Sequence, residues 1–199
     1  LIVSVNEFLL SSRIEHEKRS GEQVMCVGVI PAVVLVVGQF GEKDYSMIFT
    51  ALMASNLADT MASSIGNAYS KKVYSIISFK PVERGQSGAV SMIGTSAAFF
   101  ASLIMSILYM GLNLQQSIEK NIFRGTIVFL AGILGMFIDS LLGAVIQKKY
   151  ICVSCGKIVE NQYCCNRKAK KISSLKCLSN CQVNLVTNIV LFFLLISFS

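Results

Sequence analysis

Long apolar runs separated by short charged segments place the strongest constraint on how this chain can fold. Five runs, at residues 24–40, 45–65, 88–110, 122–146 and 182–198, approach or exceed the length of about 20 residues that a helix needs to cross a bilayer. Of the 199 residues, 53% are hydrophobic and 15% are charged, and the mean hydropathy is +0.62. Lipid offers no hydrogen bonds to an open backbone, so these runs predict an all-α polytopic integral membrane protein with about five full transmembrane helices.

The first residues and the last long loop complete this expected architecture. Residues 1–12 form an apolar run that is too short to span and lacks a basic start, so we interpret it as a partial N-terminal helix. Residues 148–180, just before the last helix, form a loop that holds most of the seven cysteines. We expect a single membrane domain, residues 1–199, into which this Cys-rich loop is inserted.

Lysine and arginine are concentrated in alternate loops. The segments 13–22, 66–87 and 147–180 hold 15 of the 18 basic residues, whereas Lys43, Lys120 and Arg124 are left for the opposite side. By the positive-inside rule the three basic loops face the cytoplasm, across the plasma membrane if the source is prokaryotic. The expected partner is therefore the lipid bilayer and not a nucleic acid, and the basic loops can also be topology signals and nothing more.

The run at residues 45–65 carries polar side chains on one helical face. Asn56, Asp59, Thr60 and Ser63 follow one another at i, i+3, i+4 and i+7, which places them on the same side of a helix. An ionised carboxylate inside a membrane costs several kcal/mol, so it marks a functional site by default.

The run at residues 122–146 repeats this arrangement. A stripe of small and polar residues continues just past its end, with Ser140 beside its acid: Gly132, Gly135, Asp139, Gly143 and Gln147. Small residues at this spacing allow two helices to approach closely. Both acids lie near the cytoplasmic ends of their helices, so we expect Asp59 and Asp139 to face each other.

A third polar face occurs at the cytoplasmic end of the last helix, formed by Asn180, Asn184, Thr187 and Asn188. Amides and hydroxyls also hold membrane helices together by hydrogen bonding, and that interpretation stays open for each stripe alone. Three polar stripes lie at the cytoplasmic ends of their helices, and two of them contain acids. Together they favour a functional site.

The loop that enters the run at residues 88–110 adds features of an anion site. Gly85 and Gly88 permit backbone conformations that other residues avoid, and a helix that starts here exposes free N–H groups. Lys80 and Arg84 add positive charge, and Ser91 lies at the helix start. Together with carboxylates that suit Mg²⁺, these are the groups that phosphoryl transfer requires.

The chain also resembles a known family of integral membrane proteins, which includes the animal transmembrane protein 19, prokaryotic membrane proteins and the plant phytyl-phosphate kinase of vitamin E synthesis. The resemblance lies in residues 23–24, 58–66, 82–91, 139–147 and 180–184, in the order found in the family. It implies a polyprenyl-phosphate kinase-like activity that transfers the γ-phosphate of a nucleotide, expected to be CTP, to an isoprenoid monophosphate.

The expected roles follow from the residues and the resemblance together. Asp59 and Asp139 are expected to hold Mg²⁺, with Arg84 as a third catalytic residue. Phosphate and nucleotide binding is expected of Thr60, Ser63, Lys80, Gly85, Gly88, Ser91, Ser140, Gln147, Asn180 and Asn184. Two alternatives stay open, namely a nucleotidyltransferase that forms a CDP-lipid, and a non-catalytic protein that binds or scaffolds lipids.

The chain departs from the family pattern at a few positions. The family usually has Glu at Ser64, Asn at Val27, and Asp or Asn at the position of Ser179 or Cys181. Loss of the Glu removes a third metal ligand or base, so we expect binding of nucleotide or lipid phosphate with slow or absent kinase turnover.

Four cysteines of the long loop form a candidate zinc knuckle, with Cys152 and Cys155 spaced as Cys-x-x-Cys before Gly156, and Cys164 and Cys165 nine residues further on. Adjacent cysteines strain one tetrahedral site, so one of the pair can be a bystander, with Cys177 or Cys181 in its place. Free thiols and a redox pair are the alternatives. Cys26, in an apolar run, is expected to be a packing residue.

Overall fold

The computed structural model describes residues 21–40, 45–156, 158–159, 163–165, 167–172 and 177–198. Its helices are α2 (Gly21–Phe40), α3 (Ser46–Tyr69), α4 (Met92–Leu112), α5 (Ile118–Ile146) and α6 (Asn180–Leu195), which ends in the short 3-10 helix Ile196–Phe198. The partial helix expected at residues 1–12 lies outside the described residues. The prediction of a mostly helical membrane protein is confirmed.

The expected count of five full spans is not confirmed among the described helices. By length and composition, α4, α5 and the segment Asn180–Phe198 can each cross a membrane, and α2 contributes the shorter apolar stretch Val24–Phe40. Helix α3 is 24 residues long but does not meet the same criterion. Its polar face, which includes Asn56 and Asp59, lowers its hydropathy.

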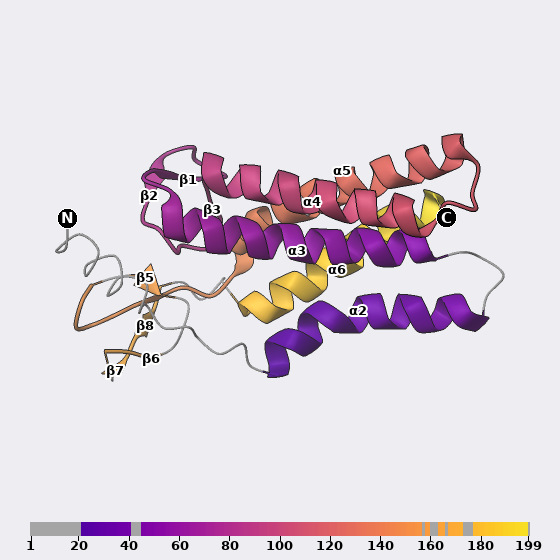
Figure 1. Ribbon diagram of the computed structural model, residues 1–199. Helices are drawn as coiled ribbons and strands as arrows, with labels where there is room; N and C mark the ends of the chain where they lie inside the picture. Colours follow the sequence, from indigo (N-terminus) through magenta and orange to yellow (C-terminus); the bar gives the residue numbers. More distant parts are fainter. Residues whose placement is uncertain are drawn as a thin grey trace, which may run out of the picture.

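Helix α4 buries mostly small side chains and exposes large apolar ones. Figure 1 shows α3, α4 and α5 running alongside one another, with α6 crossing beneath them and α2 lying beyond α6. The buried positions of α4 are Gly94, Ala98, Ala101, Ser102, Ser106 and Tyr109. Its exposed positions include Phe99, Phe100, Leu103, Ile104, Ile107 and Leu108. This distribution is expected where close helix packing needs small side chains and the outer surface meets lipid.

Glycines on α5 set the distance between the helices. A Cβ added at Gly135 would overlap the Ser55 side chain of α3, and one added at Gly132 would overlap Ser102 of α4. Toward the centre, Met47, Leu52 and other apolar residues of α3 join Val128 and Leu191 in the main apolar core. The glycine stripe predicted on this helix therefore serves packing.

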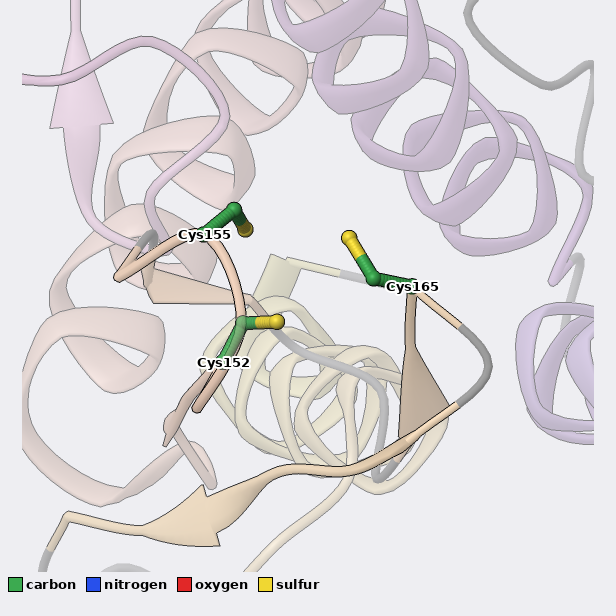
Figure 2. A group of neighbouring side chains, drawn as sticks. All are labelled: Cys152, Cys155 and Cys165. Atoms are coloured by element: carbon green, nitrogen blue, oxygen red, sulfur yellow. The ribbon is translucent and has the colours of Figure 1, made fainter.

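Short strands in two loops correct the all-α expectation. In the loop between α3 and α4, β1 (Val73–Ser75) pairs antiparallel with both β2 (Pro81–Val82) and β3 (Ala89–Val90). In the Cys-rich loop, β4 (Tyr150–Ile151) pairs with β5 (Ile158–Val159) and β8 (Lys170–Lys171), and β6 (Tyr163–Cys164) pairs with β7 (Arg167–Lys168). In this Cys-rich loop the side chains of Cys152, Cys155 and Cys165 turn toward one another (Figure 2).

Polar contacts join the first turns of α2 to the bundle. Pro31 has no N–H to donate to the carbonyl of Val27, four residues earlier. The side-chain amides of Asn56 and Asn188 donate to this carbonyl instead, at 3.2 and 3.3 Å. For Asn56 and Asn188, the interpretation that amides join helices is therefore confirmed.

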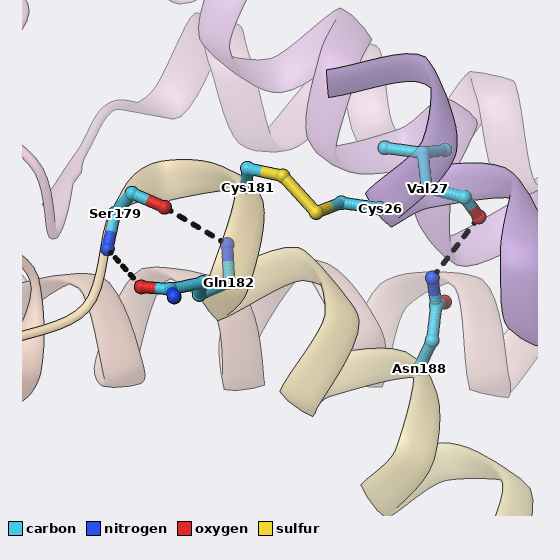
Figure 3. The surroundings of a disulfide bond; sticks show 6 residues. All are labelled: Cys26, Val27, Ser179, Cys181, Gln182 and Asn188. Atoms are coloured by element: carbon cyan, nitrogen blue, oxygen red, sulfur yellow. Dashed lines mark hydrogen bonds between the residues drawn. A yellow bond between two sulfur atoms is a disulfide. The ribbon is translucent and has the colours of Figure 1, made fainter. Parts of the chain in front are cut away.

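A covalent bond lies beside these contacts. Cys26 of α2 is joined by a disulfide to Cys181 of α6, 155 residues further along the chain (Figure 3). The expectations that Cys26 is only a packing residue and that Cys181 can serve as a zinc ligand are therefore wrong, because the bond occupies both sulfurs. Ser179 caps α6 in a capping box with Gln182, so this departure from the family pattern retains a good helix start.

Candidate functional site

A cavity of about 280 Å³ lies at the end of the bundle where α3 and α5 finish and α4 and α6 begin. Residues at helical spacing line it from both α3 and α5. From α3 these are Asp59, Ala62, Ser63 and Gly66, and from α5 and its C-cap they are Met136, Asp139, Ser140, Gly143 and Gln147. Each set runs at intervals of three and four residues, so one face of each helix forms a wall. The start of α4 and the Gly-rich turn before it form the third wall.

The two acids lie on different helices of the same cavity. Asp59 comes from α3 and Asp139 from α5, and Asp139 is only 8% exposed. The hydroxyl of Thr187, on α6, donates a hydrogen bond of 3.1 Å to Oδ1 of Asp139. This contact fixes the orientation of the carboxylate, as the outer partners of metal ligands do in other proteins.

The Gly-rich turn requires its glycines. Gly85 and Gly88 have φ angles of +77° and +78°, in the left-handed region that other residues rarely adopt. The N–H of Gly85 donates to Oδ1 of Asn67 at 3.2 Å. A Cβ on Gly88 would lie 2.7 Å from Cα of Ala144, so glycine also lets the turn approach α5.

Ser91 has a structural task in this wall. Its hydroxyl oxygen accepts from the N–H of Gly94 at 3.1 Å as the N-cap of α4, and the Ser70 hydroxyl donates to it at 2.7 Å. Ser91 therefore lines the cavity, but its hydroxyl oxygen is already used as an acceptor at the start of α4.

Two polar atoms at the cavity lack a hydrogen bond within the described part of the chain. Gln147 is only 2% exposed, and its Nε2 has no acceptor there. The hydroxyl of Ser87 is likewise buried and unpaired among the described residues. Leaving a buried polar group unsatisfied costs about 1–3 kcal/mol, so such atoms commonly mark the position of a ligand or water. Both line the cavity, and an acceptor such as a phosphate oxygen would satisfy them.

The structure brings most of the predicted site residues together. Those that line the cavity are Asp59, Ser63, Gly85, Gly88, Ser91, Asp139, Ser140, Gln147 and Asn180. Four described residues are not brought to it, namely Thr60, Lys80, Arg84 and Asn184. Lys80 and Arg84 are exposed on the loop, where no helical period fixes a direction. Asn184 lies one turn deeper along α6.

Sequence reasoning overlooked three residues of this site. Asn67 lies in the last turns of α3, four residues after Ser63, but the expected helix ended at residue 65 and left it out. Ser87 lies in a loop, where spacing carries no signal, although it stands between the two glycine positions. Thr187 belongs to the predicted polar face of α6 but was assigned no role. Its place on that stripe, opposite the acid of α5, was the available signal.

The predicted zinc ligands are only partly described. Cys152, Cys155 and Cys165 have their sulfur atoms within 4.8 Å of one another. The side chain of Cys164 lies outside the described residues. Cys177 is exposed and is not part of this group in the described chain.

Comparison with known proteins identifies a family and several relatives. The family model described as Integral membrane protein DUF92 matches residues 8–192. An uncharacterized membrane protein of Synechocystis sp. is 34% identical over 144 residues, covering 67% of this chain and 53% of that protein. Protein PGR of Arabidopsis thaliana is 30% identical over 201 residues, covering 90% of this chain and 69% of its own length.

A shorter match joins the chain to Protein VTE6, chloroplastic, of Arabidopsis thaliana. It is 33% identical over 81 residues, covering 41% of this chain and 24% of that protein. The chain thus spans about half of the Synechocystis relative and less of VTE6. No solved structure matches the chain.

Proposed function

This chain belongs to the integral membrane family DUF92, and on that premise we propose that it is a kinase-like transferase acting on an isoprenoid monophosphate. The phosphoryl donor is a nucleotide, CTP in this proposal, and the cavity faces the cytoplasm because the basic loops lie at its end of the bundle. Kinship with Protein VTE6 supports the kinase-like class. Lys80 and Arg84 draw anionic ligands toward the cavity by their charge.

The observation that carries this proposal is the combination of groups in one cavity. Asp59 and Asp139 supply hard carboxylate oxygens, while Gln147 and Ser87 present buried donors that lack acceptors among the described residues. Carboxylates alone repel a phosphate, and donors alone do not require a metal. Their coexistence fits a metal-phosphate complex better than it fits an apolar ligand.

The donor set passes a test for Mg²⁺, because this ion takes one or two carboxylates together with phosphate oxygens and water. Asp59 and Asp139 would hold the ion, which would offset negative charge on the transferring phosphoryl group. Thr187 keeps the Asp139 carboxylate oriented, and the side-chain amide of Gln147 would donate to a phosphate oxygen.

The reaction needs no protein base in this proposal. An oxygen of the isoprenoid monophosphate attacks the γ-phosphorus, and the bond from that phosphorus to the bridging β–γ oxygen breaks. The products are a nucleoside diphosphate and an isoprenyl diphosphate. A phosphate monoester has a second pKa of about 6, so the attacking oxygen is already deprotonated near neutral pH. Ser64 is exposed and lies outside the described lining of the cavity, and this proposal assigns no base to that position.

The decisive test is incubation of the purified full chain with γ-labelled CTP or ATP and a panel of isoprenyl monophosphates. Transfer of label to a product heavier by one phosphate supports the proposal. A product heavier by CMP identifies a nucleotidyltransferase, and no turnover of any nucleotide leaves the scaffold alternative; either result overturns it.

Substitutions locate the activity. Asp59→Asn and Asp139→Asn should each lower turnover by at least about 10²–10³-fold, since each removes charge from the reacting centre. Glu83→Gln, a matched change of an exposed carboxylate outside the described lining, should leave turnover unchanged. Ser64→Glu, which restores the residue usual in the family, should raise turnover by less than about tenfold if no base is needed. Full activity in both Asp variants would reject this site.

A further inference from the structure

Three cysteines converge outside the cavity. The sulfur atoms of Cys152, Cys155 and Cys165 all lie within 4.8 Å of one another (Figure 2), and the Cys26–Cys181 disulfide lies apart from this group. Zinc–sulfur bonds of about 2.3 Å place the sulfurs of a tetrahedral site about 3.8 Å apart. Small side-chain rotations therefore convert the observed arrangement into three corners of a zinc site.

The backbone adopts left-handed conformations at or next to these cysteines. The N–H of Gly156 donates to the carbonyl of Cys152 at 2.9 Å, and Gly156 has a φ of +70°. Cys165 has a φ of +52°, a left-handed conformation that costs a residue with a Cβ about 1–2 kcal/mol. Such conformations persist where other contacts hold them, and a metal–sulfur bond is such a contact.

The surrounding charge favours a metal thiolate. Three thiolates and one Zn²⁺ have a net charge of −1, and binding to the thiols releases three protons. The strands β7 and β8 carry Arg167, Lys168, Lys170 and Lys171, and β8 pairs directly with β4, which ends one residue before Cys152. Soft sulfur ligands select zinc over the hard ion expected in the cavity. Cys155 and Cys165 are exposed, which gives the ion a path of entry.

The cysteine cluster is connected to the wall of the cavity. Lys149, three residues before Cys152, donates from Nζ to the carbonyl of Ser87 at 2.8 Å. Tyr150, between them, is buried at 7% exposure and fixes this short segment. Ser87 lines the cavity, so the position of Lys149 bears directly on the Gly-rich turn.

We propose that Cys152, Cys155 and Cys165 bind one structural Zn²⁺, and that this ion holds the Gly-rich turn in place through Lys149. Water or a further side chain completes the tetrahedron. Metal binding here does not depend on the proposed transferase activity, and both parts are tested without measuring turnover.

The first experiment measures zinc in the full chain purified in detergent without chelator. We expect about one zinc per chain, and thiolate-to-metal charge-transfer absorption after exchange with Co²⁺. Outer partners of metal ligands are worth about 10–100-fold in affinity, so loss of a ligand in Cys155→Ser or Cys165→Ser should weaken binding by more than about 100-fold.

Cys177→Ser is the matched control, because Cys177 is also exposed but lies outside the cluster. It should keep its zinc. Absence of zinc from the unsubstituted chain, retention by both Cys155→Ser and Cys165→Ser, or equal loss in Cys177→Ser would overturn the metal site. The exposed positions are used because Ser at the buried Cys152 can impair folding by itself.

The second experiment measures hydrogen exchange in the Gly-rich turn, where the N–H of Ala89 donates to the Gln86 carbonyl at 3.0 Å. Removal of zinc by a chelator should speed exchange of this amide by about fivefold, the value of one hydrogen bond. Lys149→Met should produce the same change with zinc content unaltered. Unchanged exchange after zinc removal would overturn the connection to the cavity while leaving the metal site to the first experiment.

Discussion

The three-helix unit of α3, α4 and α5 is assembled differently from the attachment of α2. Within the unit, backbones approach closely because Gly132 and Gly135 face the serines Ser102 and Ser55. Helix α2 carries no such contact among the described glycines. A Cβ at its Gly28 would meet nothing within 4 Å. It is held by one disulfide, by hydrogen bonds to the Val27 carbonyl, and by the apolar packing of its buried residues Pro31 and Val34.

This difference bears on where the chemistry is placed. Close packing is spread over many contacts and tolerates little displacement, whereas a few directional bonds can be broken one at a time. Both acids, Asp59 and Asp139, belong to the three-helix unit, and α2 contributes no residue to the described lining of the cavity. The carboxylates are thus positioned by the part of the molecule with the least freedom to move.

Breaking the covalent attachment of α2 should have the largest effect. Removal of a native disulfide costs about 2–4 kcal/mol, so the double substitution Cys26→Ser, Cys181→Ser should lower the stability of the α2 attachment by this amount. Unfolding in detergent, followed with and without a reductant, measures it. The reductant should destabilise the unsubstituted chain to the level of the variant and leave the variant unchanged. A reductant effect that persists in the variant would place the bond elsewhere.

Tightening the three-helix unit should have the next largest effect. In Gly135→Ala the new methyl group overlaps Ser55, and overpacking of this kind costs about 1–3 kcal/mol. Gly111→Ala is the control, because a Cβ there meets nothing within 4 Å. Ser55→Gly removes the side chain that the new methyl group overlaps, so it should cost less stability in the Gly135→Ala background than in the Gly111→Ala background, as measured by thermal unfolding. Equal stability of the two alanine variants would show that close approach does not hold the unit together.

The sequence predicted the three-helix unit better than it predicted the attachment of α2. Helical periodicity alone determines that Asp59 and Ser63 share a face, as do Asp139 and Gly143, so the two long walls of the cavity could be found in advance. Periodicity says nothing about side chains in loops, which explains why Lys80 and Arg84 were expected at the cavity and are exposed instead.

Contacts between segments far apart in the sequence were the second feature that the sequence could not predict. The pairing of Cys26 with Cys181 depends on how α2 and α6 come together, and 155 intervening residues leave no local pattern for it. Pro31 in a helix implies that one backbone hydrogen bond is missing. Only the assembled bundle shows which side chains donate to the free carbonyl instead.

The smallest effect is expected at this replacement and can be isolated by a double-mutant cycle. Asn188→Leu removes one hydrogen bond to the Val27 carbonyl, which in membrane proteins averages about 0.6 kcal/mol and reaches about 1.7. Pro31→Ala introduces an N–H four residues after Val27, so the carbonyl gains a donor inside its own helix. The cost of Asn188→Leu should therefore be smaller in the Pro31→Ala background, whatever other contacts the leucine makes. Identical costs in both backgrounds, measured by unfolding in detergent, would mean that the two amides do not substitute for the donor that proline lacks.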